Sequence, residues 1–267
     1  MRKLCYFINS DWYFDLHWID RAIASRDAGY EIHIISHFID DNIINKFKTF
    51  GFICHNVTLD AQSFNALVFF RTYHDVQKII KNIKTKLIQM STDCVFSGRR
   101  GTYNEASIPD GETYYDRTKA LGEVNDSRNL TFRNSIVGPD MYENGIGLFN
   151  WFMKQNAPIG GYTKAVWTGV TTLTLAKAMD AALETNLSGL YNLVNNDTIS
   201  KYELLGLFNK YFKDGKLQIN ENPDFICDKS LVNNRKDFPF IVPSYEIMVQ
   251  EMHEWIISHK ELYPHYF

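Results

Sequence analysis

Short apolar runs alternate with amphipathic segments along the first 90 residues of the chain. The apolar runs predict buried parallel strands at residues 4–8, 31–36, 53–59 and 87–90. Between them, apolar side chains recur every three or four positions, which predicts helices over residues 16–29, 43–51 and 64–84. Strands that alternate with helices form βαβ units, so this part of the chain predicts a parallel sheet with helices on its faces.

The remaining residues continue the pattern with shorter elements. They predict a helix over residues 145–154, a strand at residues 189–194, and a helix that begins at a capping box formed by Ser200 and Glu203. The last long helix begins at residues 243–244. Its stripe of methionine and aromatic side chains is typical of a surface that faces a core.

Composition and charge favour an ordinary globular protein. The 267 residues are 45% hydrophobic and 22% charged, and the formal net charge of -3 gives no electrostatic reason to bind nucleic acid or an anionic membrane. No stretch approaches the roughly 18 apolar residues of a membrane span, and the apolar run at the amino terminus is too short for a signal peptide. We therefore expect a cytoplasmic protein with no nucleic-acid partner and no membrane span.

The four cysteines lie far apart in the sequence, at positions 5, 54, 94 and 227. They lack the CxxC spacing of a zinc site and the regular spacing of a disulfide framework. We expect free thiols, as in most intracellular proteins, and no bound metal.

A candidate proton-donating site lies between residues 86 and 119. The strand at residues 87–90 leads into the sequence STDCVFSG at residues 91–98, so the hydroxyl of Thr92 lies just beyond the carboxyl end of the strand, where parallel sheets bind ligands. Tyr115 and Lys119 lie one helical turn apart and share a helix face. A phenol is a poor proton donor at neutral pH unless a neighbouring ammonium stabilises its ionised form. For Asp93, a role in forming the turn and a catalytic role are both open.

The loop after the first predicted strand contains no glycine over residues 9–17. A dinucleotide pyrophosphate needs glycines so that the backbone can approach it at the amino terminus of a helix. We therefore expect that this loop does not bind a pyrophosphate in the usual way. Asp40 and Asp41, after the second strand, are interpreted as a helix cap and a solvated turn rather than as a ribose-binding acid.

Residues 1–86 resemble the amino-terminal domain of a glycosyltransferase with two Rossmann-like domains. The resemblance rests on the opening strand, on the sequence NSDWYF at residues 9–14, and on the turn RDAGY at residues 26–30 before the second strand. It implies a segment that holds a sugar acceptor, because the donor sugar nucleotide of that family is held mainly by a second domain. Nothing after residue 90 resembles that second domain.

Residues 87–267 resemble an extended short-chain dehydrogenase/reductase, and within that family the dTDP-4-dehydrorhamnose reductases. The resemblance is carried by STDCVFSG at residues 91–98, YDRTKALGE at residues 115–123 and FRNSIVG at residues 132–138. Cys94 departs from the family, which usually has an aromatic residue at that position, so the shape of the pocket beside it is open.

The two resemblances imply an α/β fold with a Rossmann-like parallel sheet flanked by helices and a smaller carboxyl-terminal substrate-binding lobe, divided at residues 1–86 and 87–267. The reductase resemblance also implies NADP or NAD as cofactor and a nucleotide sugar as the small-molecule substrate. Tyr115 would donate a proton to the sugar carbonyl oxygen, and Thr92 would hydrogen-bond the same oxygen. Tyr115 and Lys119 would contact the cofactor, with Lys119 at the nicotinamide ribose.

The leading hypothesis is an NAD(P)-dependent reductase-like protein that acts on a nucleotide-activated keto-deoxy sugar and is impaired by the loss of the glycine-rich cofactor loop. The alternative is a catalytically inactive hybrid of a glycosyltransferase acceptor domain and a reductase fragment.

Overall fold

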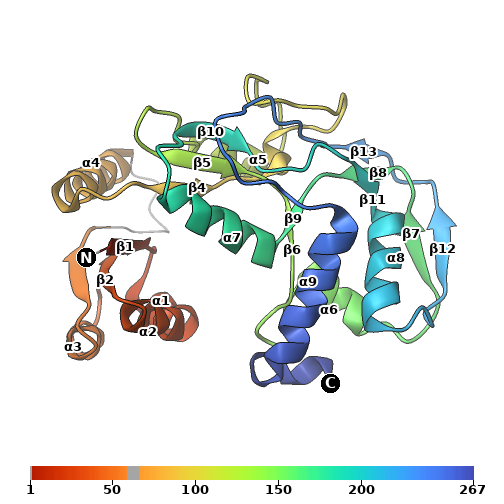
Figure 1. Cartoon of the computed structure of the whole chain (residues 1–267). Coiled ribbons are helices and arrows are strands. Elements are labelled where there is room, and N and C mark those ends of the chain that lie inside the picture. Colours follow the sequence, from red (N-terminus) through yellow and green to blue (C-terminus); the bar gives the residue numbers. More distant parts are fainter. Residues whose placement is uncertain (1, 59–65) are drawn as a thin grey trace. The chain divides into compact units, whose positions relative to one another are not determined.

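The computed structural model describes residues 2–58 and 66–267, and it divides into two compact units, Met1–Leu87 and Ile88–Phe267 (Figure 1). Residues Leu59 and Phe64, which end a predicted strand and begin a predicted helix, lie outside the described residues. Each unit is described by itself.

The first unit is a three-stranded parallel sheet with helices on both faces. Its elements are β1 (Arg2–Phe7), α1 (Asp11–His17), α2 (Ile19–Asp27), β2 (Tyr30–Ser36), α3 (Asp41–Thr49), β3 (Ile53–Asn56) and α4 (Ala66–Ile83). The strand order is β1-β2-β3, and the register pairs Leu4 with Ile32 and Ile34 with Cys54. The predicted alternation of strands and helices is therefore confirmed in this unit.

Both sides of the central strand β2 are buried, because its successive residues point to opposite faces of the sheet and helices cover each face. On one side, Ile32 and Ile34 pack with buried residues of α1, α2 and α3, among them Phe14 and Phe47. On the other side, Ile35 packs with a cluster that includes Val76 and Ile80 of α4.

Two helix predictions needed correction. Residues 11–17, predicted as a loop, form helix α1, and the predicted helix at residues 16–29 is mainly α2, which begins after Trp18 and ends before Gly29, whose φ of +92° favours glycine. In α4, Leu67 and Phe70 belong to the predicted apolar face, yet they are 78% and 66% exposed. The buried cluster that joins α4 to Ile35 of the sheet contains Val76 and Ile80, which lie in the second half of the helix.

The second unit begins with a parallel sheet of strand order β10-β5-β4. Its first elements are β4 (Ile88–Met90), η1 (Asp93–Val95), α5 (Tyr114–Leu121), β5 (Leu130–Arg133), β6 (Ile136–Val137), α6 (Leu148–Met153), β7 (Ile159–Tyr162), β8 (Ala165–Trp167) and β9 (Val170–Thr171). The chain continues through α7 (Thr172–Leu183), β10 (Gly189–Asn192), β11 (Ile199–Ser200), α8 (Lys201–Phe212), β12 (Ile219–Asn222), β13 (Cys227–Asp228), α9 (Tyr245–Ser258), η2 (Lys260–Leu262) and η3 (Pro264–Tyr266).

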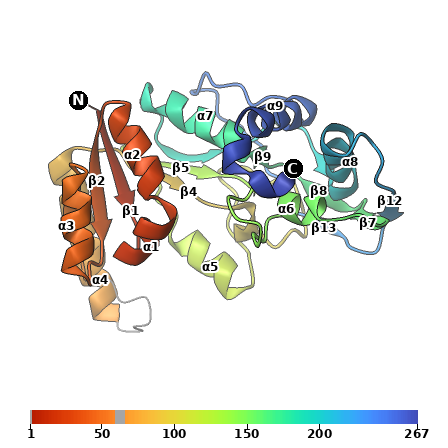
Figure 2. The same cartoon turned by 90° about the horizontal axis from the view of Figure 1, so that it is seen from below.

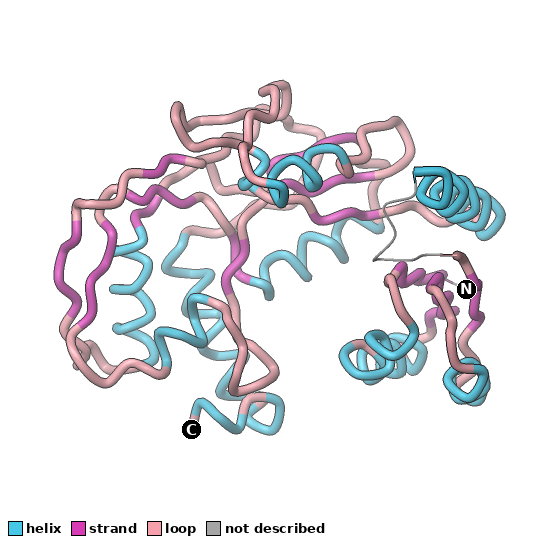
Figure 3. The backbone as a smooth tube through the Cα atoms, turned by 180° about the vertical axis from the view of Figure 1, so that it is seen from behind, coloured by secondary structure: helices cyan, strands magenta, loops and turns pink. Residues whose placement is uncertain are grey.

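The carboxyl-terminal helices enclose the main core of this unit. Helix α9 packs against α7 and α8, as Figure 2 shows, and α8 lies against the two-stranded ribbon of β7 and β12 (Figure 3). The stripe predicted for the last helix is partly in this core. Met248 and Met252 are buried, whereas Ile247 and Trp255 are 49% and 38% exposed.

Local stop and start signals agree with the structure. Ser200 and Glu203 form the predicted capping box at the start of α8, and Asp40 caps α3 by accepting a hydrogen bond from the backbone N–H of Asn42 at 2.8 Å.

All four cysteines are free thiols. Over residues 2–58 and 66–267, no helix combines the length and the apolar character needed to cross a bilayer.

Candidate functional site

Thr92 lies beyond the carboxyl end of β4, where the sequence predicted it. Its hydroxyl oxygen accepts a hydrogen bond from the backbone N–H of Cys94 at 3.1 Å and so caps the short 3₁₀ turn η1. The same hydroxyl donates to the carboxylate of Asp93 at 3.2 Å. Thr92 is therefore held in one orientation, with its proton directed to Asp93.

Tyr115 and Lys119 lie on α5, which packs against η1. The ammonium of Lys119 donates a hydrogen bond to the backbone carbonyl of Met90 at 2.9 Å, next to the end of β4. The side chain of Tyr115 is 57% exposed. The fold thus brings Lys119 to the strand end that bears Thr92 and leaves the phenol of Tyr115 open to solvent.

Helix α5 is fixed in place by its amino-terminal residues. Thr113 and Asp116 form a capping box, with the Thr113 hydroxyl accepting from the Asp116 N–H and the Asp116 carboxylate accepting from the Thr113 N–H. Gly111 allows the chain to approach η1 closely, because a Cβ there would lie 2.4 Å from the Cβ of Asp116 and 2.9 Å from the carbonyl oxygen of Cys94. These local features determine where Tyr115 and Lys119 stand.

Two residues of the reductase-like motifs form a buried ion pair behind this site. Arg133 ends β5, and its guanidinium donates to Glu123 through Nε at 2.9 Å and through Nη2 at 2.6 Å. Ser91, at the end of β4, donates to the same carboxylate at 2.5 Å. The pair ties β4 and β5 to the end of α5, so these motif residues support the site rather than line it.

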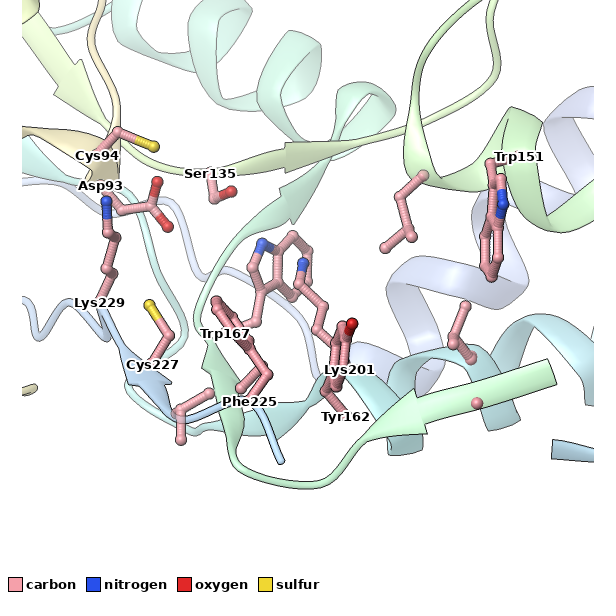
Figure 4. Close-up of a pocket in the computed structure, with 15 residues that line it drawn as sticks. Asp93, Cys94, Ser135, Trp151, Tyr162, Trp167, Lys201, Phe225, Cys227 and Lys229 are labelled. Atoms are coloured by element: carbon pink, nitrogen blue, oxygen red, sulfur yellow. The ribbon is translucent and has the colours of Figure 1, made fainter. Parts of the chain in front are cut away.

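A cavity of about 490 Å³ opens beside η1 in the unit Ile88–Phe267 (Figure 4). Four aromatic side chains line it: Trp151, Tyr162, Trp167 and Phe225. Its polar lining consists of Asp93, Cys94, Ser135, Lys201, Cys227 and Lys229. Among the described residues that line the cavity, none is one of the three predicted catalytic residues, although Asp93 and Cys94 directly follow Thr92.

The sequence carries only partial signals for this lining. Cys94 departs from the reductase motif, and Trp167 lies in a segment that resembles a strand and turn of that family. No sequence signal indicates a ligand-binding role for Lys201, which directly follows Ser200 of the predicted capping box. It lines the cavity because α8 begins at that residue and packs beside β7 and β12.

Burial determines the charge states in the cavity. It raises the pKa of the Asp93 carboxyl above its ordinary value, and the charge of Lys201 partly opposes this change. It lowers the pKa of Lys201 to about 8, again opposed by the charge of Asp93. Burial also raises the pKa of the Cys94 and Cys227 thiols, so neither has the ionised form of a nucleophile at neutral pH.

The loop after β1 in the amino-terminal unit differs from the glycine-rich loop that usually binds the pyrophosphate of a dinucleotide. Asp11, the first residue of α1, is 1% exposed, and its carboxylate accepts hydrogen bonds from the backbone N–H groups of Ile39 at 2.8 Å and Asp40 at 3.1 Å. It also accepts from the N–H of Trp12 at 2.8 Å. A carboxylate therefore occupies the helix start where a pyrophosphate would bind, and it would repel one. The residues present do not fit a dinucleotide at this loop, in agreement with the missing glycines.

A metal-binding cluster of three or more His, Cys, Asp or Glu side chains is absent from the part of the chain that the structure describes.

Solved structures with a similar fold include sugar-nucleotide enzymes. A dTDP-4-dehydrorhamnose reductase from Yersinia enterocolitica matches with a TM-score of 0.63 and 14% identity over 94% of this chain and 100% of that one. A dTDP-glucose 4,6-dehydratase from Bacillus anthracis, in complex with NAD, matches with a TM-score of 0.62 and 13% identity over 100% of both chains.

A UDP-N-acetylglucosamine 4-epimerase from Methanobrevibacter ruminantium, in complex with UDP-N-acetylmuramic acid, matches with a TM-score of 0.63 and 13% identity over 97% of this chain and 99% of that one. At such identities the likeness is one of fold. It confirms the predicted α/β architecture of parallel strands flanked by helices.

Sequence comparison identifies the family. No curated protein sequence matches the chain. The family model described as the RmlD substrate binding domain matches residues 60–218, which is more than half of the chain. This match confirms the resemblance of the region after residue 87 to the dTDP-4-dehydrorhamnose reductases of the extended short-chain dehydrogenase/reductases, and it begins before that region. The chain therefore belongs to the RmlD substrate binding domain family.

Proposed function

We propose that this protein binds a nucleotide-activated keto-deoxy sugar in the cavity of the unit Ile88–Phe267, and that its NAD(P)-dependent reductase chemistry is impaired by the amino-terminal loop. The observation that carries the first part is the lining of the cavity. Aromatic rings suit stacking with a nucleobase or a sugar face, and the ammonium groups of Lys201 and Lys229 suit phosphate or hydroxyl oxygens.

Similar proteins are consistent with this ligand class. One solved structure of similar fold, the WbmG enzyme of Bordetella bronchiseptica, is a complex with NAD and UDP. Another holds UDP-N-acetylmuramic acid. Membership of a substrate-binding-domain family extends the same expectation to residues 60–218 of this chain.

We assign the proton-donating role to Tyr115, with Thr92 and Lys119 beside it. Lys119 is anchored to the Met90 carbonyl and Thr92 is anchored to η1, so both are held at the end of β4. The phenol of Tyr115 is open to an incoming ligand. These residues would orient a carbonyl group and supply its proton.

The impairment follows from Asp11. Its buried carboxylate already takes the backbone N–H groups of the loop after β2, and its negative charge opposes a phosphate at the start of α1. NADP or NAD, the cofactors expected from the reductase resemblance, would therefore bind weakly or not at all.

Two titrations test the proposal. Calorimetry with dTDP-glucose and UDP-glucose should show saturable binding in the micromolar range, whereas nicotinamide fluorescence should show no saturation with NADPH or NADH up to millimolar concentration. Saturable NADPH binding that is abolished by Lys119→Ala and retained in Lys216→Ala, a change at an exposed lysine paired with Asp214, would show that the cofactor site is intact.

A second candidate is the catalytically inactive hybrid of a glycosyltransferase acceptor domain and a reductase fragment. The observation that favours it is again Asp11, because neither the glycosyltransferase-like segment nor the reductase-like segment then offers a site for the pyrophosphate of a dinucleotide. The hybrid would bind neither the cofactors nor the two sugar nucleotides in the same titrations. The division of the chain at residues 86 and 87 and the cytoplasmic location remain predictions.

A further inference from the structure

Lys201 is a half-buried cation whose ammonium has no hydrogen-bond partner among the described residues. It is the first residue of α8, and its ammonium lies over the ring of Trp167, 4.7 Å from the ring centroid. In residues 2–58 and 66–267, the Lys201 ammonium donates no hydrogen bond, and no carboxylate lies within 4.0 Å of it. A buried ammonium normally has such partners, because desolvation of a charge is costly.

Asp93 faces the same cavity, and its carboxylate can accept further hydrogen bonds. It is 8% exposed, and it is the one carboxylate among the described residues that line the cavity. It accepts a hydrogen bond from the Thr92 hydroxyl, and a carboxylate can accept about four in total. Figure 4 shows the side chains of Asp93 and Lys201 directed into the cavity from different elements.

The two groups attract each other electrostatically without forming an ion pair. Both side chains are directed into one cavity, so a ligand group that contacts both would accept a hydrogen bond from the ammonium and donate one to the carboxylate. A hydroxyl group does both. A phosphate or a carboxylate would be attracted by the ammonium of Lys201 but repelled by the carboxylate of Asp93.

We propose that Asp93 and Lys201 together hold one hydroxyl group of the sugar and so select substrates that carry a hydroxyl at that position. This inference rests on the proposed binding of a nucleotide sugar and adds a specificity determinant to it. The aromatic rings of Trp167 and Tyr162 line the same cavity and suit the apolar face of a sugar ring.

The charge states support this assignment. Burial lowers the pKa of Lys201 to about 8, so the ammonium is short of stabilising partners, and a hydroxyl acceptor would supply one. The Ser135 hydroxyl lines the same cavity, and Lys229 is a second cation there. Lys229 also acts on Asp93, but the charge of Lys201 lowers the pKa of the Asp93 carboxyl more than that of Lys229 does.

The test compares each nucleoside diphosphate with its sugar derivative by calorimetry, using dTDP with dTDP-glucose and UDP with UDP-glucose. The wild-type protein should prefer the sugar derivative by about tenfold or more, as expected for a hydrogen bond to a charged group. Lys201→Met and Asp93→Asn should each reduce this preference to about threefold or less without changing the affinity for the diphosphate. The double variant should lose little more than either single variant, because the hydroxyl needs both partners.

Matched controls separate this effect from general changes of charge. Lys210→Met removes an exposed lysine from the same helix, and Asp214→Asn removes an exposed carboxylate. Both controls should keep the wild-type preference. If Lys201→Met weakens the binding of the diphosphate as much as the binding of the sugar derivative, Lys201 contacts phosphate and the inference is wrong. If none of the four compounds binds the wild-type protein, the proposed function fails, and the assignment of the hydroxyl fails with it.

A measurement on the wild-type protein covers the case in which a variant does not fold. Acetylation of lysines by acetic anhydride, followed by mass spectrometry, should show that dTDP-glucose protects Lys201 more strongly than dTDP does. Lys210 should react equally in both samples. Equal protection of Lys201 by the two compounds would contradict the proposed contact with the sugar.

Discussion

Replacing Glu123 by glutamine should strongly destabilise the unit Ile88–Phe267, because it removes the counter-charge of a buried guanidinium. The side chains of Arg133 and Glu123 are 2% and 7% exposed, and two hydrogen bonds of 2.9 and 2.6 Å join them. The guanidinium also lies 4.8 Å from the ring centroid of Phe96, and its Nη1 is buried without a hydrogen-bond partner in the described residues. Among the described residues no second carboxylate pairs with this guanidinium, so it keeps no counter-charge when Glu123 becomes glutamine.

The expected magnitude follows from this burial. Breaking a buried ion pair by removing one partner lowers the free energy of unfolding by about 3–5 kcal/mol. In a unit of this size each kcal/mol lowers the Tm by about 2–4 °C, so Glu123→Gln should lower it by roughly 6–20 °C. An exposed pair such as Lys210 with Glu246 should contribute little to stability, because water screens both charges.

The assay is a double-mutant cycle of Glu123→Gln and Arg133→Met, followed by thermal and urea unfolding with circular dichroism. Each single variant should lose most of the stability contributed by the pair. The double variant should lose clearly less than the sum of the two, because no unpaired charge remains. Glu246→Gln serves as the control, because it makes the same change in an exposed ion pair. A loss for Glu123→Gln no greater than that for Glu246→Gln would refute the reasoning.

Three further predictions concern single positions. Gly101→Ala should destabilise the protein by more than 1 kcal/mol in urea unfolding, because φ is +72° and the new Cβ would lie 2.2 Å from a carboxylate oxygen of Asp228; a neutral result would contradict this. Ser200→Ala removes the cap of α8 and should lower the free energy of unfolding by about 1 kcal/mol. Ser200→Thr is the comparison, because threonine can also cap the helix and should keep most of that stability. Burial and the neighbouring His33 lower the pKa of His55, so the folded state binds fewer protons than the unfolded state. Stability of the first unit should therefore be complete above about pH 6.5 and decrease below it, and His55→Gln should flatten this decrease between pH 7 and 5.

Local sequence signals determined much of this protein. Apolar runs of four to six residues specified the strands β1, β2 and β4, and capping residues such as Asp40 and Ser200 specified where helices begin. Thr92 lies two residues after the end of β4, and Tyr115 and Lys119 are four positions apart on α5, so spacing along the chain predicted where each lies on its own element. The absence of glycine from the loop after β1 likewise indicated the lack of a pyrophosphate cradle before the structure showed Asp11 in its place.

Only the tertiary structure decided which side chains meet across long stretches of sequence. Asp93 and Lys201 face one cavity because η1 and the start of α8 are brought together by the packing of the second unit, and no periodicity of the chain encodes that contact. The same holds for Glu123, which sequence reasoning assigned to a motif and which the fold pairs with Arg133. Leu67 and Phe70 show the opposite case, because helical periodicity placed them on an apolar face that the short sheet does not cover. Spacing along the chain determines which residues share a face, whereas burial of that face depends on the surface available to cover it.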